Sequence, residues 1–364
     1  MQARTSHTHQ EIAQLLRRPE DYSLYEAYLA KGESLFWHGH HEEARPLLKK
    51  ALDFFGSNVE EYKDDYVHAM NACVLNLNKL NEYHSSQKIL SNSLQYVEHF
   101  SLDQQIDFYF QLASVLEKAG LYEDSIYYFV RIEEFISKHS FQERYKVIFG
   151  LANLHLIQFA LEKYEFHKAE SYLPNAEKYI SPDDWQYAQV NLSRAVIAAA
   201  QANDELVIQF AEKAYWQTVE SENQLTKLTN LRSLQLLSNA HYQLKNWVAV
   251  QYYSKVGLDH YLGLNEVELG EDILIFHCMS GVACEKLKFI EEADAHFGVV
   301  FDALSTLAQD RKEDVLLVFE NLQLNDYISQ SNLSGETKNR MNELYSRCEE
   351  NQEPRKILSL RLSQ

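Results

Sequence analysis

The sequence predicts an all-α fold, a right-handed α-solenoid of about seven stacked helix pairs with capping helices at its C-terminal end. Three observations predict it. The chain of 364 residues has only 11 Gly and 5 Pro, so tight turns and interrupted helices are few. Hydrophobic residues make up 46% of the chain and recur at helical spacing. One pattern of small and large residues also returns along most of the chain, which indicates a repeat architecture.

The repeated pattern is built around a small residue, here called the anchor. A large residue follows four positions later, a small or aliphatic residue seven positions later, and another small residue precedes the anchor by twelve positions. The clearest copies have the anchors Ala44, Ser125 and Ala293, preceded by Gly32, Ala113 and Gly281 and followed by Leu48, Phe129 and Phe297. Because residues four apart share a helix face, each copy predicts two antiparallel helices that approach closely at the small residues.

Weaker copies fill the gaps, with anchors at Ser86, Ala169, Val207 and Ala249. Successive anchors are then 42, 39, 44, 38, 42 and 44 residues apart. No single pair can bury its apolar face, whereas stacked pairs share a continuous core. The turns "KAGLYEDS" and "KLKFIEEA" place acidic residues in the first turn of the second helix, where they interact favourably with the helix dipole.

The repeat array is expected over residues 25–305. A polar tail or leading helix, residues 1–24, precedes it, and capping helices with a terminal tail, residues 306–364, follow it. Two helices are predicted at 312–328 and 334–351, the second with Ser334 as its N-cap. The last residues, "RKILSLRLSQ", form either a docking tail or a frayed end.

Composition excludes several functions. The formal charge of -19 repels phosphate backbones, so we expect no nucleic-acid partner. No stretch resembles a signal peptide or a membrane span, and none of the four cysteines lies in a Cys-x-x-Cys pair. We therefore expect a cytoplasmic protein without a membrane partner.

No catalytic residue set, phosphate-binding loop or zinc-type spacing is present, so we expect no enzyme and no cofactor. The segment "WHGHHEEA" places His38, His40 and His41 close together, a spacing that can chelate a divalent ion. These histidines occupy positions that the repeat assigns to an exposed turn. We favour that interpretation and expect no metal site.

The anchor pattern resembles the tetratricopeptide repeat, whose second helix carries Ala, Phe and Ala positions like those of the first, third and seventh copies. The period near 40 exceeds the 34 residues of the standard repeat. In this respect the chain looks like the arrays of bacterial regulators such as Rap-type peptide-sensing proteins and the MalT-like sensor domain. The resemblance implies that the first helices line a concave groove that holds a peptide or partner segment.

The candidate groove residues follow from the repeat pattern. They are Leu29, Glu33, Phe36, Asn71, Asn78, Phe110, Ser114, Leu154, Gln158, Gln189, Leu192, Leu234 and His241, accompanied by His68, Leu75, Asp107, Glu117, Leu151, Ser238, Cys278 and Glu285. This mixture of apolar, amide and acidic side chains suits a neutral or basic segment. We expect a non-enzymatic scaffold, a bacterial cytoplasmic regulator that binds a protein or peptide. The alternatives are a Rap-like modulator of a response regulator and a dedicated chaperone or assembly factor of a secretion or pilus system. Whether the protein forms a homo-oligomer is left open.

Overall fold

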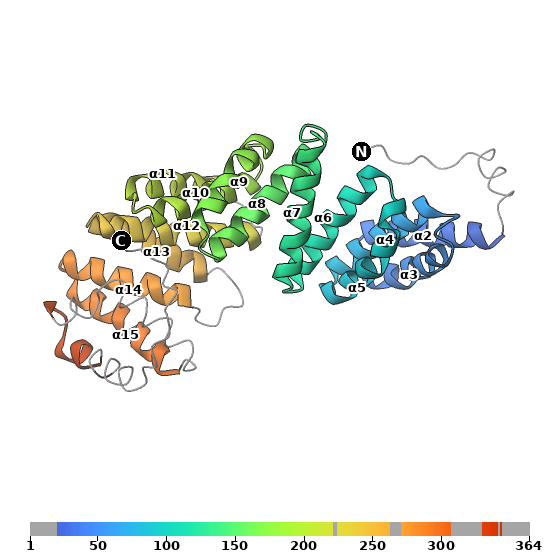
Figure 1. The fold of residues 1–364 in the computed structure, drawn as a ribbon. Helices are drawn as coiled ribbons and strands as arrows, with labels where there is room; N and C mark the ends of the chain where they lie inside the picture. Colours follow the sequence, from blue (N-terminus) through green and yellow to red (C-terminus); the bar gives the residue numbers. More distant parts are fainter. Residues whose placement is uncertain (1–19, 221–223, 263–270, 307–329, 341–342, 344–364) are drawn as a thin grey trace. The chain divides into compact units, whose positions relative to one another are not determined.

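The structure is a computed structural model that describes residues 20–220, 224–262, 271–306, 330–340 and 343. Within these ranges it contains fourteen α-helices, one short 3-10 helix and no strand (Figure 1). The prediction of an all-α fold built from helix pairs is confirmed. The pairs are α2 (Glu20–Trp37) with α3 (His41–Ser57), α4 (Lys63–Lys79) with α5 (Tyr83–Ser93), α6 (Leu102–Lys118) with α7 (Tyr122–Lys138), α8 (Lys146–Glu162) with α9 (Phe166–Tyr179), α10 (Gln186–Ala200) with α11 (Asp204–Thr218), α12 (Gln224–Gln243) with α13 (Trp247–Leu262), and α14 (Glu271–Lys286) with α15 (Ile290–Thr306). The 3-10 helix η1 (Leu94–His99) follows α5.

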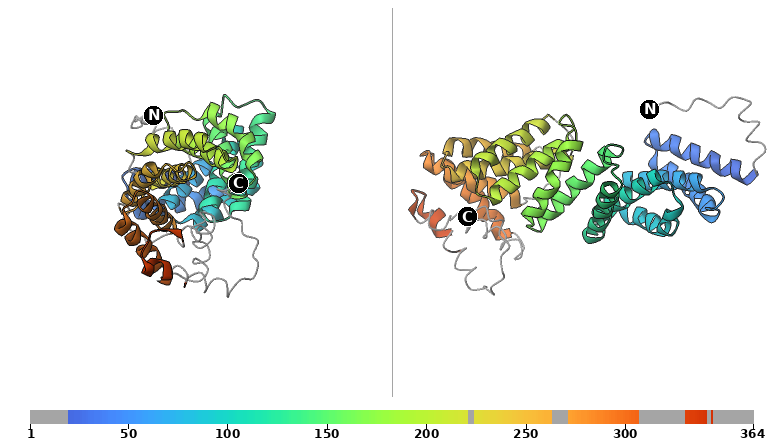
Figure 2. Two further views of the ribbon diagram at one scale, coloured as in Figure 1. Left: turned by 90° about the vertical axis from the view of Figure 1, so that its left-hand side faces the viewer. Right: turned by 45° about the horizontal axis from the view of Figure 1, so that its top comes forward.

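The chain forms two compact units, residues 1–155 and 156–364, and α8 spans the boundary between them. In the first unit, consecutive helices from α2 to α7 pack against one another. In the second unit, the same holds from α9 to α15, and the first helices α10, α12 and α14 also contact each other in turn. Figure 2 shows the resulting helical hairpins from two further sides. Each unit therefore builds its core from the stacking of neighbouring pairs.

Every first helix ends in the same turn. A residue with left-handed backbone lies five positions before six of the anchors and four before Ala249: Gly39, Asn81, Gly120, Tyr164, Ala202, Lys245 and Lys288, with φ between 54° and 82°. The next amide donates to the carbonyl five residues earlier, as in His40 N to Leu35 O at 2.9 Å and Leu121 N to Leu116 O at 2.8 Å. This is the Schellman helix end, which satisfies carbonyls that the last helical turn leaves free. The seven turns confirm the seven repeats.

The helices of each pair cross at the small residues. Ala44, Ala113, Ala169 and Ala293 are fully buried, as predicted. In the third repeat the anchor hydroxyl, Ser125 Oγ, donates to the carbonyl of Ala113 at 2.8 Å. The small side chains thus let one helix backbone come within hydrogen-bond reach of the other helix.

The sixth repeat corrects the predicted register by one residue. Lys245 sets the turn, and the buried positions are then Val250 and Ser254, while Ala249 stays partly exposed. Ser254 Oγ lies 3.2 Å from Ser238 Oγ at the helix crossing. The pattern was misread because this repeat has no large residue at the position four after its anchor. Phe276 of α14 occupies the space beside Gly257, seven positions after the anchor, where an added Cβ would lie 2.5 Å from Phe276 Cζ.

A short C-terminal segment lies on the last repeat. Ser334 is a helix N-cap as predicted, because its Oγ accepts the Thr337 amide at 3.2 Å. Thr337 Oγ1 donates to Asp294 at 2.6 Å, and both nitrogens of Asn332 donate to Glu285 at 3.2 Å. These contacts hold residues 332–337 against α14 and α15, and a capping role for the whole C-terminal region stays a prediction. The predicted helix at 312–328, residues 1–19 and the tail from 344 onward lie outside the described residues.

Candidate functional site

The first helices of successive repeats present equivalent side chains. We call the positions 18, 15, 11 and 8 residues before each anchor the A-helix face. Contacts recur at two of these positions: Glu33 Oε1 lies 2.5 Å from His68 Nε2, and Gln158 Nε2 donates to Gln189 Oε1 at 3.2 Å. Each contact joins the position 11 before one anchor to the position 18 before the next anchor. The residues of this face therefore lie side by side from one first helix to the next within each unit.

Between α6 and α8 a cluster of aromatic and acidic side chains adjoins the A-helix face. Glu117 Oε2 lies 3.1 Å from His155 Nδ1. The His155 ring stacks on Phe129 with centroids 4.4 Å apart, and Phe110 meets both rings edge-on at 5.9 and 6.5 Å. Phe110 stays half-buried. It thus offers part of its ring as an apolar contact next to a carboxylate.

The predicted site residues divide into partly accessible and buried ones, and the buried set includes Ser238, Cys278 and Glu285 besides four leucines. Half-buried, and so partly accessible, are Glu33, Phe36, Asn71, Asn78, Phe110, Ser114, Gln158, Gln189 and His241. The prediction was wrong for the leucines Leu29, Leu154, Leu192 and Leu234, which are buried in the core. An apolar side chain at the edge of a helix face gains more by turning inward than by facing water.

The register explains the fourth leucine. Leu234 belongs to the shifted sixth repeat, and the correct position 15 before its anchor is Gln235, which is half-buried. His241 moves to the position nine before the anchor. Its ring stacks on Tyr253 at 5.4 Å, and burial lowers the pKa of this histidine below its ordinary value. Tyr253 donates its hydroxyl to Glu212 at 2.9 Å, and burial followed by this carboxylate raises the tyrosine pKa.

Three amide oxygens on the A helices of the first unit have no hydrogen-bond partner among the described residues. They belong to Asn71 and Asn78 on α4 and to Gln111 on α6. Asn71 and Asn78 are seven residues apart, about 10 Å along the helix, and Leu75 lies between them with 46% of its surface exposed. Leaving a buried acceptor unpaired costs roughly 1–3 kcal/mol. Both asparagines are half-buried, so part of each residue stays accessible although its side-chain oxygen is buried.

Sequence reasoning missed two residues of this kind. Gln111 lies one position beyond the Phe110 that the pattern selected, and Asn239 is hidden by the shifted register of the sixth repeat. Asn239 is 5% exposed and its Oδ1 has no partner within the described residues. Knowing that Lys245 forms the left-handed turn would have identified Asn239 as the residue 11 before the anchor. A lysine, however, gives no sequence signal for that backbone conformation.

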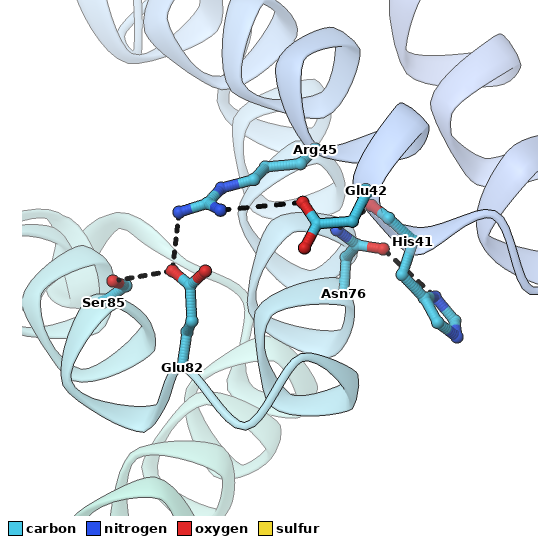
Figure 3. A network of polar contacts seen from close by, with 6 residues as sticks. All are labelled: His41, Glu42, Arg45, Asn76, Glu82 and Ser85. Atoms are coloured by element: carbon cyan, nitrogen blue, oxygen red, sulfur yellow. Dashed lines mark hydrogen bonds and ion pairs between the residues drawn. The ribbon is translucent and has the colours of Figure 1, made fainter.

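Figure 3 shows the polar contacts that fix the second repeat to the first. Arg45 of α3 donates to Glu82 at 2.7 Å, and Asn76 Nδ2 of α4 donates to the His41 carbonyl at 3.0 Å. The His41 ring nitrogen Nδ1 lies 3.3 Å from Asn76 Oδ1. These side chains lie at the turn edge, and their mutual pairing gives them a structural role.

The histidines of "WHGHHEEA" do not converge on one point. His38 Nδ1 lies 2.7 Å from the carbonyl of Ser34, and His40 lies 3.4 Å from Glu43. Among the residues that the structure describes, no group of three or more His, Cys, Asp or Glu side chains is arranged to hold a metal ion. The histidines of this segment therefore lie at a turn, and each contacts a different group.

The described helices include none that is both long and apolar enough to cross a membrane. Three of the cysteines, Cys73, Cys278 and Cys284, are buried free thiols. Burial raises the pKa of Cys73 to about 12, so this thiol is protonated at neutral pH and is a poor nucleophile.

Comparison with known proteins gives matches in structure only, since no protein-family model and no curated protein sequence matches the chain. NprR in complex with its cognate peptide NprX is 11% identical with a TM-score of 0.47 and covers 90% of both chains. The apo form of the quorum sensor NprR from B. thuringiensis is 12% identical with a TM-score of 0.49, over 89% of this chain and 92% of that one. A Rap protein complexed with Competence and Sporulation Factor is 11% identical with a TM-score of 0.45, over 88% and 93%. Likeness at this level assigns no function.

Proposed function

We propose that this protein is a non-enzymatic scaffold that binds an extended peptide or protein segment on the A-helix face of its first unit. One observation carries the proposal: the partnerless amide oxygens of Asn71, Asn78 and Gln111 lie next to the accessible apolar surface of Leu75 and Phe110. A face that only covered a core would have no use for unsatisfied acceptors beside exposed apolar groups.

The chemistry of the face fits a peptide backbone. An asparagine side chain offers one acceptor and two donors, which complement the N–H and C=O of an extended segment. The spacing of about 10 Å between Asn71 and Asn78 spans roughly three residues of extended chain, which rises about 3.3 Å per residue. A peptide held at both asparagines would place an apolar side chain near Leu75, and Phe110 would supply a second anchor on α6.

The charge of the face favours a neutral or basic segment. Glu33 and Glu117 belong to it, and the whole chain carries a formal charge of -19. Apolar anchors would supply most of the affinity, and the carboxylates would mainly orient and accelerate the encounter. An acidic peptide would meet repulsion at the same place.

A binding experiment tests the proposal directly. A randomised peptide library is selected on the purified full chain, and the enriched peptide is titrated by calorimetry into the parent and into Asn71→Ala/Asn78→Ala. The double variant should bind about 5- to 150-fold more weakly with unchanged helicity, since each of the two lost hydrogen bonds contributes about 0.5–1.5 kcal/mol. Asn92→Ala, on the exposed side of α5, is the matched control and should bind like the parent.

A second variant tests the apolar anchor. Phe110→Gln removes a half-buried ring, whereas Leu154, which is packed in the core, is unsuitable because its replacement would disturb folding. Equal affinity of the parent and of both folded variants would refute binding at this face. A partner would then have to use another surface.

A further inference from the structure

The last described repeat brings two histidine rings together. His277 of α14 and His296 of α15 are both half-buried, and their Nδ1 atoms lie 2.9 Å apart. The ring centroids are 5.1 Å apart and the planes are inclined by 52°. The two nitrogen atoms, one from each helix of the hairpin, are within hydrogen-bond distance, so in the metal-free protein one ring donates to the other.

Packing alone does not require imidazoles here. His277 lies 16 residues before its anchor and His296 lies three after it, a pair of positions that face each other in the hairpin. In the third repeat the same positions hold Tyr109 and Tyr128, which stack at 5.8 Å. The equivalent pairs in the other repeats are Tyr28 with Leu47, Met70 with Ile89, Asn153 with Tyr172, Asn191 with Phe210, and Leu234 with Tyr253. Among the seven repeats, these two positions carry two ring nitrogens only in the last.

The separation of the two nitrogens fits a shared metal ion. First-row divalent ions bind imidazole nitrogen at about 2.0–2.1 Å. Two such bonds at a right angle place the nitrogens about 2.9 Å apart, the geometry of adjacent positions in the square-planar or tetragonal coordination that Cu²⁺ and Ni²⁺ favour. A tetrahedral zinc ion would need a wider separation, about 3.3–3.4 Å.

We propose that His277 and His296 form a two-histidine binding site for a divalent transition-metal ion, with water or an external donor completing the coordination. The surroundings support this assignment. Glu292 lies one turn before His296 on α15, and its exposed carboxylate adds negative charge near the pair. Cys284 Sγ lies 3.9 Å from that carboxylate. Burial lowers the pKa of both histidines, that of His277 to about 4.

Titration of the metal-free full chain with Ni²⁺ by calorimetry tests the site, with Cu²⁺ electron paramagnetic resonance as a second readout of nitrogen ligation. His277→Phe and His296→Tyr introduce aromatic residues of the kind the other repeats carry here, and each should lose one equivalent of bound Ni²⁺. His38→Asn/His40→Asn/His41→Asn removes the competing histidine-rich turn and should keep that equivalent.

Thermal melting supplies an independent check. Saturating Ni²⁺ should raise the melting temperature of the parent and of the triple control, because an ion that binds only the folded state stabilises it, whereas the two single variants should not respond. If the single variants bind and respond like the parent, or if the triple control loses the tight equivalent, the site is not at His277 and His296. Peptide affinity at the A-helix face should be unchanged in all of these variants. The metal site is therefore tested independently of the proposed function.

Discussion

Replacing Gly281 by alanine tests the repeat packing most sharply. A Cβ at this position in α14 would lie 2.8 Å from Cε2 of Phe297 and 3.0 Å from its Cδ2 and Cζ. Phe297 is fully buried, and its ring stacks on Phe301 with centroids 6.4 Å apart, so it has little room to yield. Overpacking of this kind costs about 1–3 kcal/mol.

The matched control lies on the partner helix. Gly298 of α15 has no atom within 4 Å of the position its Cβ would take. Both glycines are helical, so both substitutions gain roughly the same helix propensity, about 1 kcal/mol. Gly298→Ala should therefore stabilise the protein slightly. The free energy of unfolding of Gly281→Ala should be lower than that of Gly298→Ala by about 1–3 kcal/mol, which is the cost of overpacking alone.

Urea unfolding followed by circular dichroism at 222 nm measures this difference through the midpoint concentration. Because repeat arrays do not always unfold in one step, the two variants are compared by midpoint and slope together and not by an extrapolated free energy alone. Equal midpoints for the two variants would refute the close helix approach at Gly281 and, with it, the anchor register of the seventh repeat.

Three further outcomes follow from the structure. Cys73, with its pKa raised to about 12, should resist a thiol reagent at pH 8 in the folded protein and react at once in denaturant. Lys288→Gly should stabilise the protein by up to about 1 kcal/mol, because φ is +73° there, whereas Gly120→Ala at φ +78° should destabilise it by a similar amount; paired melting curves check both. Arg45→Ala should cost about 1 kcal/mol or less and the cost should shrink in high salt, since the ion pair with Glu82 is partly exposed.

The repeat could be predicted from sequence because packing at the helix crossings tolerates few residue types. At the crossings Ala44, Ser125 and Ala293 had to be small, and their spacing revealed the period and six of the seven anchors. The sixth anchor was misplaced because Ser254 stands four positions after Val250, and Phe276 of the next repeat occupies the space beside Gly257. A pattern confined to one repeat contains no information about a volume that a neighbour fills.

The left-handed turns, in contrast, could not be predicted from the residues that form them. Only Gly39 and Gly120 among the seven left-handed residues are glycines, and the other five are Asn, Tyr, Ala and two Lys. Each of these costs roughly 1 kcal/mol relative to glycine. The fold accepts that cost because the Schellman hydrogen bond and the packing of the whole hairpin fix the turn. Tertiary structure thus sets a backbone conformation that the local residue does not favour.

The prediction of site residues was limited by uncertainty in the angle at which each residue points around its helix. The rule that selected the A-helix face found Asn71, Asn78 and Phe110, but it also selected Leu154, whose side chain is buried. Neighbouring helical positions differ by about 100°, so a residue at the boundary between core and surface is decided by its own chemistry. Leu154 turns inward at that boundary, whereas Asn71 and Asn78 stay half-buried.

The same comparison between repeats separates packing from function. A residue that matches its equivalents in the other repeats, as Ala293 matches Ala44, needs no explanation beyond the helix crossing. A residue that departs from its equivalents while leaving the packing intact does need one. Asn71, with its partnerless oxygen, departs from the leucines at the same position in the first, fourth and fifth repeats, and His277 departs from Tyr109. Because the stacked helices keep the backbone environment nearly constant, each departure isolates a side-chain property, hydrogen bonding in one case and metal ligation in the other, that the fold itself does not require.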